Sequence, residues 1–352
     1  MKKQIALRMG NGVSLLLNQK ALLTSGCLLI LTLLLVLLST GMGDMNISPF
    51  RVLQAIFGRG DDMERLVVTS IRLPRILMAL FVGVGLAIAG CILQGLVRNP
   101  LASPEIIGVT GGAGAAVVLF LALFSDRDTG SLMISIEWLP LGAFLGATLT
   151  AFIVYLLSYK HGEVVPLRLV LIGIGIAALM QAVTTFFMIL SPIHTASQAN
   201  IWLIGTVNGT NWGDIAVLAP WITVISLVTW IAARKLNIQQ LGDSLATGLG
   251  SNVGRQRLYL LLLCTALVGG AVAFAGGIGF VGLIAPHIAR KLVGSAYGAL
   301  IPAAALIGAL LVMAADLIGR TLFSPLEIPT GVFTAAIGAP YFIYLLLKSR
   351  ST

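Results

Sequence analysis

The stretch that decides the fold is RQRLYLLLLCTALVGGAVAFAGGIGFVGLIAPHIARK, residues 255–291. A basic pair stands at each of its ends, and loops rich in Lys and Arg mark the cytoplasmic side of a membrane protein. An even number of crossings must therefore lie between the two pairs. Residues 258–275 are one apolar crossing, and Gly276 and Gly277 offer the chain a place to reverse. The return run, residues 278–289, is shorter than the roughly 20 residues of a full span, so we expect it to be buried among other helices.

The rest of the chain has the composition of a protein that crosses a membrane many times. Its 352 residues are 58% hydrophobic and only 10% charged, far from the values of a soluble domain. Eight more apolar runs of spanning length flank the opening stretch, at about 21–39, 74–97, 105–124, 138–158, 167–190, 214–233, 297–317 and 329–347. We predict an all-α polytopic protein of the cell membrane with about ten transmembrane helices, forming a single transmembrane domain over residues 1–352.

The charges favour ten crossings with both termini in the cytoplasm. On that topology 15 of the 22 Lys and Arg residues fall on the cytoplasmic side, but only three of the 13 Asp and Glu residues do, namely Glu105, Glu163 and Asp243. The outer face then carries seven basic and ten acidic residues, a net negative charge. Such an asymmetry is typical of the positive-inside rule, and it explains the basic excess better than binding to nucleic acid would.

One long polar segment, RKLNIQQLGDSLATGLGSNVGRQR, interrupts the apolar runs at residues 234–257. Its leucines at 241, 245 and 249 recur every four residues, the spacing of one helical stripe, and glycines then end the run. We predict a short amphipathic helix on the cytoplasmic side of the membrane. Its apolar face would either bind a partner protein or rest on lipid headgroups.

Two other features concern the outer side and the packing of the spans. Residues 191–213 contain the short apolar stretch IWLI at 201–204, and Trp202 and Trp212 suit a membrane interface, so we expect a re-entrant or interfacial helix there. The chain also holds 40 glycines, many of them within the spans. Small residues let helices approach closely in lipid, which predicts tight packing. The alternative is that some glycines line a pathway for a bulky solute.

The sequence contains no motif for chemistry on a nucleotide. G-x-x-x-x-G-K-[ST] is absent, so if ATP powers transport, another chain must hydrolyse it. No acid or base stands near the middle of a predicted span, which disfavours a stand-alone secondary transporter. The three histidines are scattered at loops and span ends without catalytic neighbours, which disfavours an intramembrane enzyme. We therefore expect no catalytic residue, no metal site and no resident cofactor.

Five strings, taken together and in order, resemble one family: IRLPR at 71–75, QGLVRNPLASPEIIGV at 94–109, LGDSLATGLG at 241–250, GGIGFVGLIAPHIAR at 276–290 and LEIPTGVFTAAIGAPYFIYLL at 326–346. The family is that of the permease subunits of ATP-binding-cassette importers for iron–siderophores, haem and vitamin B12. The resemblance implies a permease that takes up a ferric siderophore, with haem or cobalamin as alternatives. It further implies a second permease subunit, like or unlike, two cytoplasmic ATP-binding subunits and an extracytoplasmic solute-binding protein.

The resemblance also implies roles for particular residues. The family's coupling helix, which contacts the ATPase, corresponds to residues that include Leu241, Gly242, Leu245, Ala246, Leu249 and Gly250. Arg72, Arg75 and Arg320 match positions where such permeases present external arginines to acidic residues of the binding protein. Arginine suits that task because its fork binds a carboxylate through two hydrogen bonds. The alternative for Arg72 and Arg75 is anchoring at the membrane interface by snorkelling.

Overall fold

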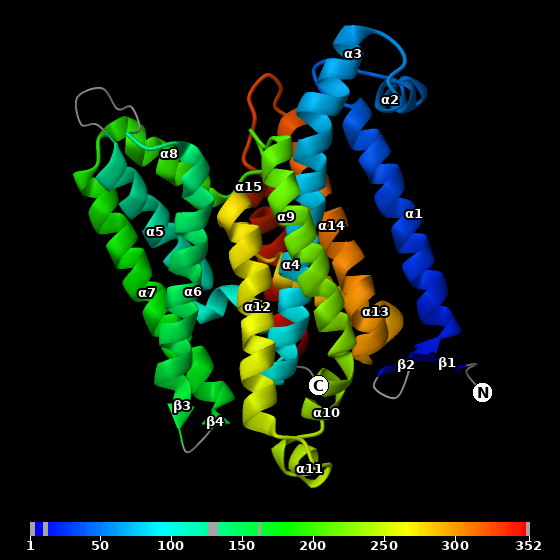
Figure 1. The fold of residues 1–352 in the computed structure, drawn as a ribbon, viewed down its shortest axis with the longest axis vertical. Helices are drawn as coiled ribbons and strands as arrows, with labels where there is room; N and C mark the ends of the chain where they lie inside the picture. Colours follow the sequence, from blue (N-terminus) through cyan, green and yellow to red (C-terminus); the bar gives the residue numbers. More distant parts are fainter. Residues whose placement is uncertain (1–3, 10–12, 126–132, 161–162, 350–352) are drawn as a thin grey trace.

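Inside a bilayer the backbone N–H and C=O groups of an apolar run find no water for hydrogen bonding. Each run therefore folds into a helix, in which these groups bond to one another. The computed structural model describes residues 4–9, 13–125, 133–160 and 163–349, which form a bundle of long, roughly upright helices (Figure 1). The helices of the bundle are α1 (Gln19–Gly41), α4 (Leu73–Val97), α5 (Val109–Phe124), α6 (Leu139–Ser158), α7 (Pro166–Leu190), α9 (Trp212–Ile231), α12 (Val253–Ala275), α13 (Val281–Val293), α14 (Tyr297–Thr321) and α15 (Thr330–Ser349).

Eight segments of the described chain are long and apolar enough to cross a membrane. α5 is a shorter apolar helix, and α13 has 13 residues. With these two, the prediction of an all-α protein with about ten spans is confirmed. The short elements are α2 (Pro49–Ile56), α3 (Asp62–Leu66), the π-helix Val67–Arg72, the 3₁₀ helices Pro104–Ile107 and Ile136–Trp138, α8 (Ile193–Ile204), α10 (Ala233–Gln239), α11 (Asp243–Gly248), and the antiparallel pairs β1 (Gln4–Met9) with β2 (Val13–Asn18) and β3 (Tyr159–Lys160) with β4 (Glu163–Val164).

α4 lies at the centre of the bundle. It packs against α14, α12, α13 and α9, and most of its side chains are buried. α5, α6 and α7 pack against one another as a second group, at the left of Figure 1, and α12 contacts both α4 and α6. α2 and α3 lie at one end of the bundle and α11 at the other; we call these the α2 end and the α11 end.

The predicted reversal after the first crossing of the opening stretch is confirmed. α12 ends at Ala275, and Gly276 has a φ of +67°, a conformation that glycine adopts without strain. The Thr206 N–H, just beyond the end of α8, donates to the Ala275 carbonyl (2.9 Å). The chain that follows α8 is therefore bonded to the end of α12, next to the turn. The first half of α13 is buried, as we expected of a short return run.

The third span begins later than its apolar run predicts. The chain first forms the 3₁₀ helix that starts at Pro104, and α5 begins only at Val109. The carboxylate of Glu105 accepts the backbone N–H of Phe280 (2.9 Å) at the start of α13. Thirteen helical residues are about 20 Å long, so Glu105 lies inside the protein, well away from the far end of α13. The sequence had placed this acid at the cytoplasmic surface, because a chain that turns back into the bundle leaves no trace in hydropathy.

Glycines bring the helix backbones into direct contact, as the packing interpretation predicts. A Cβ on Gly90 of α4 would overlap the backbone of Gly282 in α13, and a Cβ on Gly83 would overlap that of Gly308 in α14. By contrast, nothing lies within 4 Å of the Cβ that Gly175 of α7 would gain. The glycines around α4 are therefore needed for close approach.

Replacing Gly90 with leucine is expected to prevent stable folding, because the new side chain would occupy the space of the α13 backbone. Overpacking costs about 1–3 kcal/mol even where side chains can shift, and backbone shifts less easily. Thermal unfolding in detergent should show a strongly lowered Tm, or no monodisperse protein at all. Gly175→Leu is the matched control and should behave like wild type; a Gly90→Leu protein of normal Tm would mean that α4 and α13 do not meet here.

Candidate functional site

The polar segment of residues 234–257 continues α9 as two short helices at the α11 end (Figure 1). α10 packs on α4 and α14, and Leu236 is fully buried in that contact. The Tyr297 N–H, at the start of α14, donates to Asn237 Oδ1 (3.0 Å). α10 is therefore part of the rigid bundle, and the chain leaves the bundle only after it.

α11 is shorter than the helix predicted for residues 241–250. Gly242 and Gly250 have φ values of +104° and +79°, and these left-handed positions bound the helix on both sides. The helix itself covers six residues. Ala246, in its middle, is fully buried, so α11 is seated on the rest of the chain by one side.

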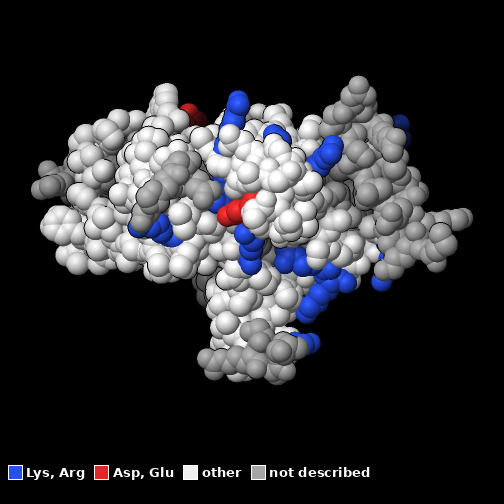
Figure 2. All heavy atoms as spheres, turned by 90° about the horizontal axis from the view of Figure 1, so that it is seen from below, with Lys and Arg blue, Asp and Glu red and all other residues white. Residues whose placement is uncertain are grey.

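Three leucines of this segment remain exposed: Leu241 by 54%, Leu245 by 60% and Leu249 by 64%. We call them the leucine surface. Burying a leucine stabilises a protein by about 1.5–3 kcal/mol, and a group of large apolar side chains left outside typically marks a contact surface. Lys and Arg predominate on this end of the molecule (Figure 2), as the charge distribution of the sequence predicts.

Asp243, the first residue of α11, joins this helix to two spans. Its Oδ1 accepts hydrogen bonds from Arg257 Nη2 (2.6 Å), in the first turn of α12, and from Arg98, which follows α4. Arg98 Nε also donates to the Gln239 carbonyl (2.9 Å), and Arg257 Nη1 donates to the Val164 carbonyl (3.0 Å). We call this arrangement the Asp243 clamp.

The charge state of the clamp follows from its partners. Partial burial alone would raise the pKa of the Asp243 carboxyl, but the hydrogen bonds and charges of Arg257 and Arg98 outweigh it and hold that pKa below its usual value. The clamp is therefore ionised at neutral pH, and its two ion pairs tie α11 to the end of α4 and the start of α12.

At the α2 end, two of the three predicted docking arginines cap the last turn of α1. Arg72 Nη1 donates to the carbonyls of Thr40 (3.0 Å) and Gly41 (3.1 Å), and its Nη2 donates to that of Met45 (2.7 Å). Arg72 is only 8% exposed. A guanidinium suits this place because the last carbonyls of a helix lack partners and carry partial negative charge.

Arg320 caps the same helix end from α14. Its Nη1 donates to the Met42 carbonyl (2.7 Å), and its Nη2 donates to the carbonyl and the hydroxyl of Ser39. Its Nε lies 3.6 Å from Oδ2 of the buried Asp316. The donors of Arg72 and Arg320 are thus largely used within this chain.

Arg75 differs, because one of its partners is exposed. Its Nη2 lies 2.9 Å from Asp316 Oδ1, and its Nη1 lies 2.9 Å from Glu327 Oε2. The Asp316 side chain is 1% exposed, whereas that of Glu327 is 42% exposed. Of the three arginines, Arg75 can therefore most readily exchange a partner for a carboxylate from outside. That the three arginines dock a binding protein stays a prediction.

Comparison with known proteins identifies the family of this chain. The family model described as the FecCD transport family matches residues 30–348. The chain belongs to the FecCD transport family. Two similar relatives are the siderophore transport system permease protein YfhA of Bacillus subtilis, 56% identical over 95% of this chain and 97% of the relative, and the achromobactin transport system permease protein CbrC of Dickeya dadantii, 45% identical over 92% and 90%.

A solved structure shares the fold of this FecCD-family chain. It is described as an inward-facing conformation of a metal-chelate type ABC transporter, and it matches with a TM-score of 0.81 and 32% identity, over 92% of this chain and 98% of the other. The chain therefore has the fold of an ABC importer permease, a multi-pass membrane protein.

Sequence reasoning missed the partners that hold these residues in place. Asp243 is the lone acid in a basic segment, which indicates an ion pair, but its partner Arg98 is 145 residues away. Glu327 is 252 residues from Arg75. In the FecCD-family chain both contacts arise from the packing of spans, and no local pattern signals them.

Proposed function

We propose that this chain is the permease subunit of a binding-protein-dependent ABC importer that takes up a ferric siderophore. The observation that carries the proposal is the leucine surface, an uncovered apolar patch on a polar segment seated on the spans by Asp243. The names of the similar permeases support the substrate class. Haem and cobalamin are the alternatives within the same family.

The proposal includes partners and an orientation. A second permease subunit, like or unlike, two ATP-binding subunits and an extracytoplasmic solute-binding protein complete the importer, and this chain itself catalyses no reaction. The excess of Lys and Arg at the α11 end supports a cytoplasmic position for that end and for both termini. The chain acts as one transmembrane domain, with residues 234–257 as its coupling loop.

The coupling loop would transmit motion in two steps. The leucine surface binds a cleft of the ATPase, with Gly242 and Gly250 setting the limits of α11 and the buried Ala246 seating it. The Asp243 clamp then carries the displacement to α4 and α12. This division separates binding of the ATPase from transmission of its motion.

Uptake in cells tests the substrate class. A strain that lacks this chain should lose uptake of radiolabelled iron offered as a ferric siderophore and regain it when the gene is restored, while uptake of haem and cobalamin stays unchanged. If haem or cobalamin uptake were lost instead, the chain would be assigned to the haem or cobalamin permeases of the family.

For docking, we propose that Arg75 meets a carboxylate of the binding protein, while Arg72 and Arg320 hold the end of α1 in shape for the contact. Arg75→Glu is then expected to abolish uptake, because a partly desolvated interfacial ion pair costs about 2–5 kcal/mol when one partner is lost. Affinity for the purified binding protein measures this directly. Arg51→Glu is the control, since Arg51 lies at the same end and its side chain is 64% exposed.

A change of Glu to Arg on the facing lobe of the binding protein should partly restore uptake by the Arg75→Glu variant. Restoration separates docking from a structural effect of the new acid beside Asp316. Normal binding by a correctly folded Arg75→Glu protein would make the three arginines structural and place the docking surface elsewhere.

A further inference from the structure

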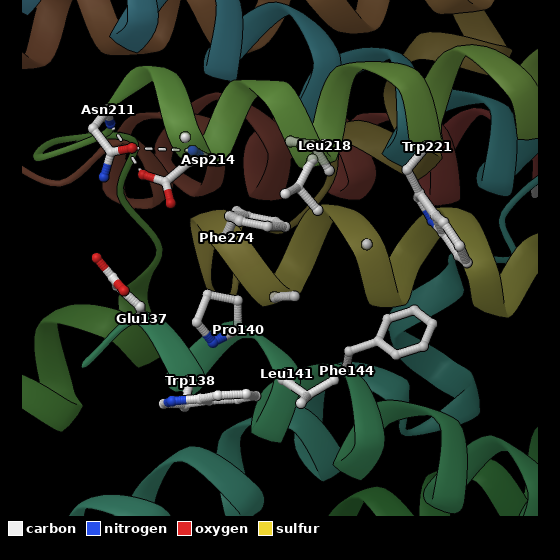
Figure 3. A pocket seen from close by; sticks show the side chains of 14 residues that line it. Glu137, Trp138, Pro140, Leu141, Phe144, Asn211, Asp214, Leu218, Trp221 and Phe274 are labelled. Atoms are coloured by element: carbon white, nitrogen blue, oxygen red, sulfur yellow. Dashed lines mark hydrogen bonds between the residues drawn. The ribbon is translucent and has the colours of Figure 1, made fainter. Parts of the chain in front are cut away.

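A cavity of about 630 Å³ lies between α6, α9 and α12 (Figure 3). The turns of these helices that line it lie towards the α2 end of the bundle (Figure 1). Its volume is within the range of small-molecule sites. It is bounded by the first turns of α6, the first half of α9 and the last turns of α12. The described lining includes no residue of the coupling loop and none of Arg72, Arg75 and Arg320.

The inner end of the cavity has an aromatic floor. Phe144 of α6 and Trp221 of α9 meet edge to face, with ring centroids 5.5 Å apart. They approach α12 closely because Gly269 and Gly270 stand there, and a Cβ at either would press on one of the two rings. Trp221 Nε1 donates to the Ala266 carbonyl (2.9 Å), which leaves the ring as a fixed apolar wall.

The opposite end of the cavity carries two carboxylates, those of Glu137 and Asp214 (Figure 3). Asp214 is held by a capping box in which its Oδ2 accepts the Asn211 N–H (3.0 Å) and its own N–H donates to Asn211 Oδ1 (3.1 Å). Glu137 is exposed. The described lining includes no Lys or Arg, so the polar end of this otherwise apolar cavity is negatively charged.

The cavity opens to the surroundings of the bundle. Leu141 and Val217 line it and are 47% and 61% exposed, and Trp138 is 57% exposed. In a bilayer, a lining of this kind would face hydrocarbon along its apolar length and the headgroup layer at its polar end. Tryptophan near the ends of spans is typical of that layer.

We propose that this cavity is a lipid site that holds a phospholipid with an ammonium headgroup, its acyl chain against the Phe144–Trp221 floor and its ammonium near Glu137 and Asp214. An anionic phospholipid would bring only negative charge to the two carboxylates, so the site selects zwitterionic aminophospholipid against it. The bound lipid fills the seam between α6 and the pair of α9 and α12. The proposal does not depend on what the protein transports.

Native mass spectrometry of the purified importer tests the site. The probes are phosphatidylethanolamine and phosphatidylglycerol with the same acyl chains, mixed in equal amounts. Wild type should retain phosphatidylethanolamine preferentially. Glu137→Gln should lower that preference by up to about fivefold, the upper end of what one exposed ion pair contributes. Glu64→Gln, an acid at the same end and outside the cavity, should leave the preference unchanged.

A second variant tests the cavity itself rather than its charge. Val217→Trp should fill the space and abolish retention of phosphatidylethanolamine. Val224→Trp is the control, because Val224 is 56% exposed on the same helix and does not line the cavity. Equal retention of both lipids by wild type would overturn the proposal, as would unchanged retention by Val217→Trp. A disulfide between two copies of a Val217→Cys protein in the membrane would overturn it too, since a second chain would then cover the cavity.

Discussion

Aspartate at Leu245 and Leu249 together is expected to abolish uptake while the protein still inserts and folds. Both side chains are more than half exposed in the free chain, so the charges cost little there. In the complex they would be buried against the ATPase, where a single central contact can be worth about 2 kcal/mol or more. We expect the affinity for the ATPase to fall about 10²- to 10³-fold.

Co-purification of the ATPase with the tagged permease measures this loss. Ser244→Asp adds a charge to the same helix outside the leucine surface and is the matched control; it should keep most of the binding. Normal co-purification and normal uptake by the double variant would rule out the leucine surface as the ATPase contact.

Removal of the clamp carboxylate is expected to separate ATP hydrolysis from transport. Asp243→Ala keeps the leucine surface, so the ATPase should still bind and hydrolyse ATP. Arg257, whose side chain is 2% exposed, would lose its carboxylate partner, which destabilises the joint between α11 and α12 by about 1–3 kcal/mol. We expect the ATP hydrolysed per solute imported to rise several-fold in proteoliposomes.

Conservative variants distinguish transmission from simple loss of structure. Asp243→Glu should restore much of the coupling, because it keeps the charge between Arg98 and Arg257. Glu64→Ala removes an exposed pair with Arg51 at the α2 end, worth about 0–1 kcal/mol, and should leave the ratio unchanged. A normal ratio in Asp243→Ala would show that the clamp plays no part in coupling.

The clamp also has a defined response to pH. The folded-state pKa of Asp243 lies below its usual value, which is about 3.9 in an unfolded chain. Its contribution to stability is therefore complete above that value and is lost as the pH falls through the lower, folded-state pKa. Coupling should not change across the neutral range through this group.

The membrane architecture could be predicted from sequence because the bilayer imposes length and hydropathy on each span. The reversal at Gly276 followed from the charges at both ends of one stretch, and that argument needs no knowledge of contacts. The start of α5 could not be predicted, since the chain returns into the bundle and half-buries Glu105, whose carboxylate accepts the N–H of Phe280. Hydropathy reports the preference of a segment for lipid. It carries no information on the hydrogen bond between Glu105 and Phe280, because the two residues are far apart in the sequence.

The sequence predicted some features of the functional residues and not others, because spacing reports local structure but not contacts between distant parts of the chain. The leucine spacing at 241, 245 and 249 is local and indicated an exposed apolar surface, although the glycines make the helix shorter than the pattern suggests. The resemblance to the permease family marked Arg72 and Arg320 as candidates for docking. Their use as caps of α1 depends on where the α1 carbonyls lie in space, which no spacing in the sequence indicates.

Transport by reconstituted protein tests the central claim most directly. The permease, its ATPase and the binding protein would be placed in proteoliposomes, and uptake of a ferric siderophore would be measured with and without ATP and with and without a proton gradient. We expect uptake that requires ATP, the ATPase and the binding protein, and that is insensitive to the gradient. Uptake by the permease alone, driven by a proton gradient without ATP, would contradict the account and would make the half-buried Glu105 the first residue to examine.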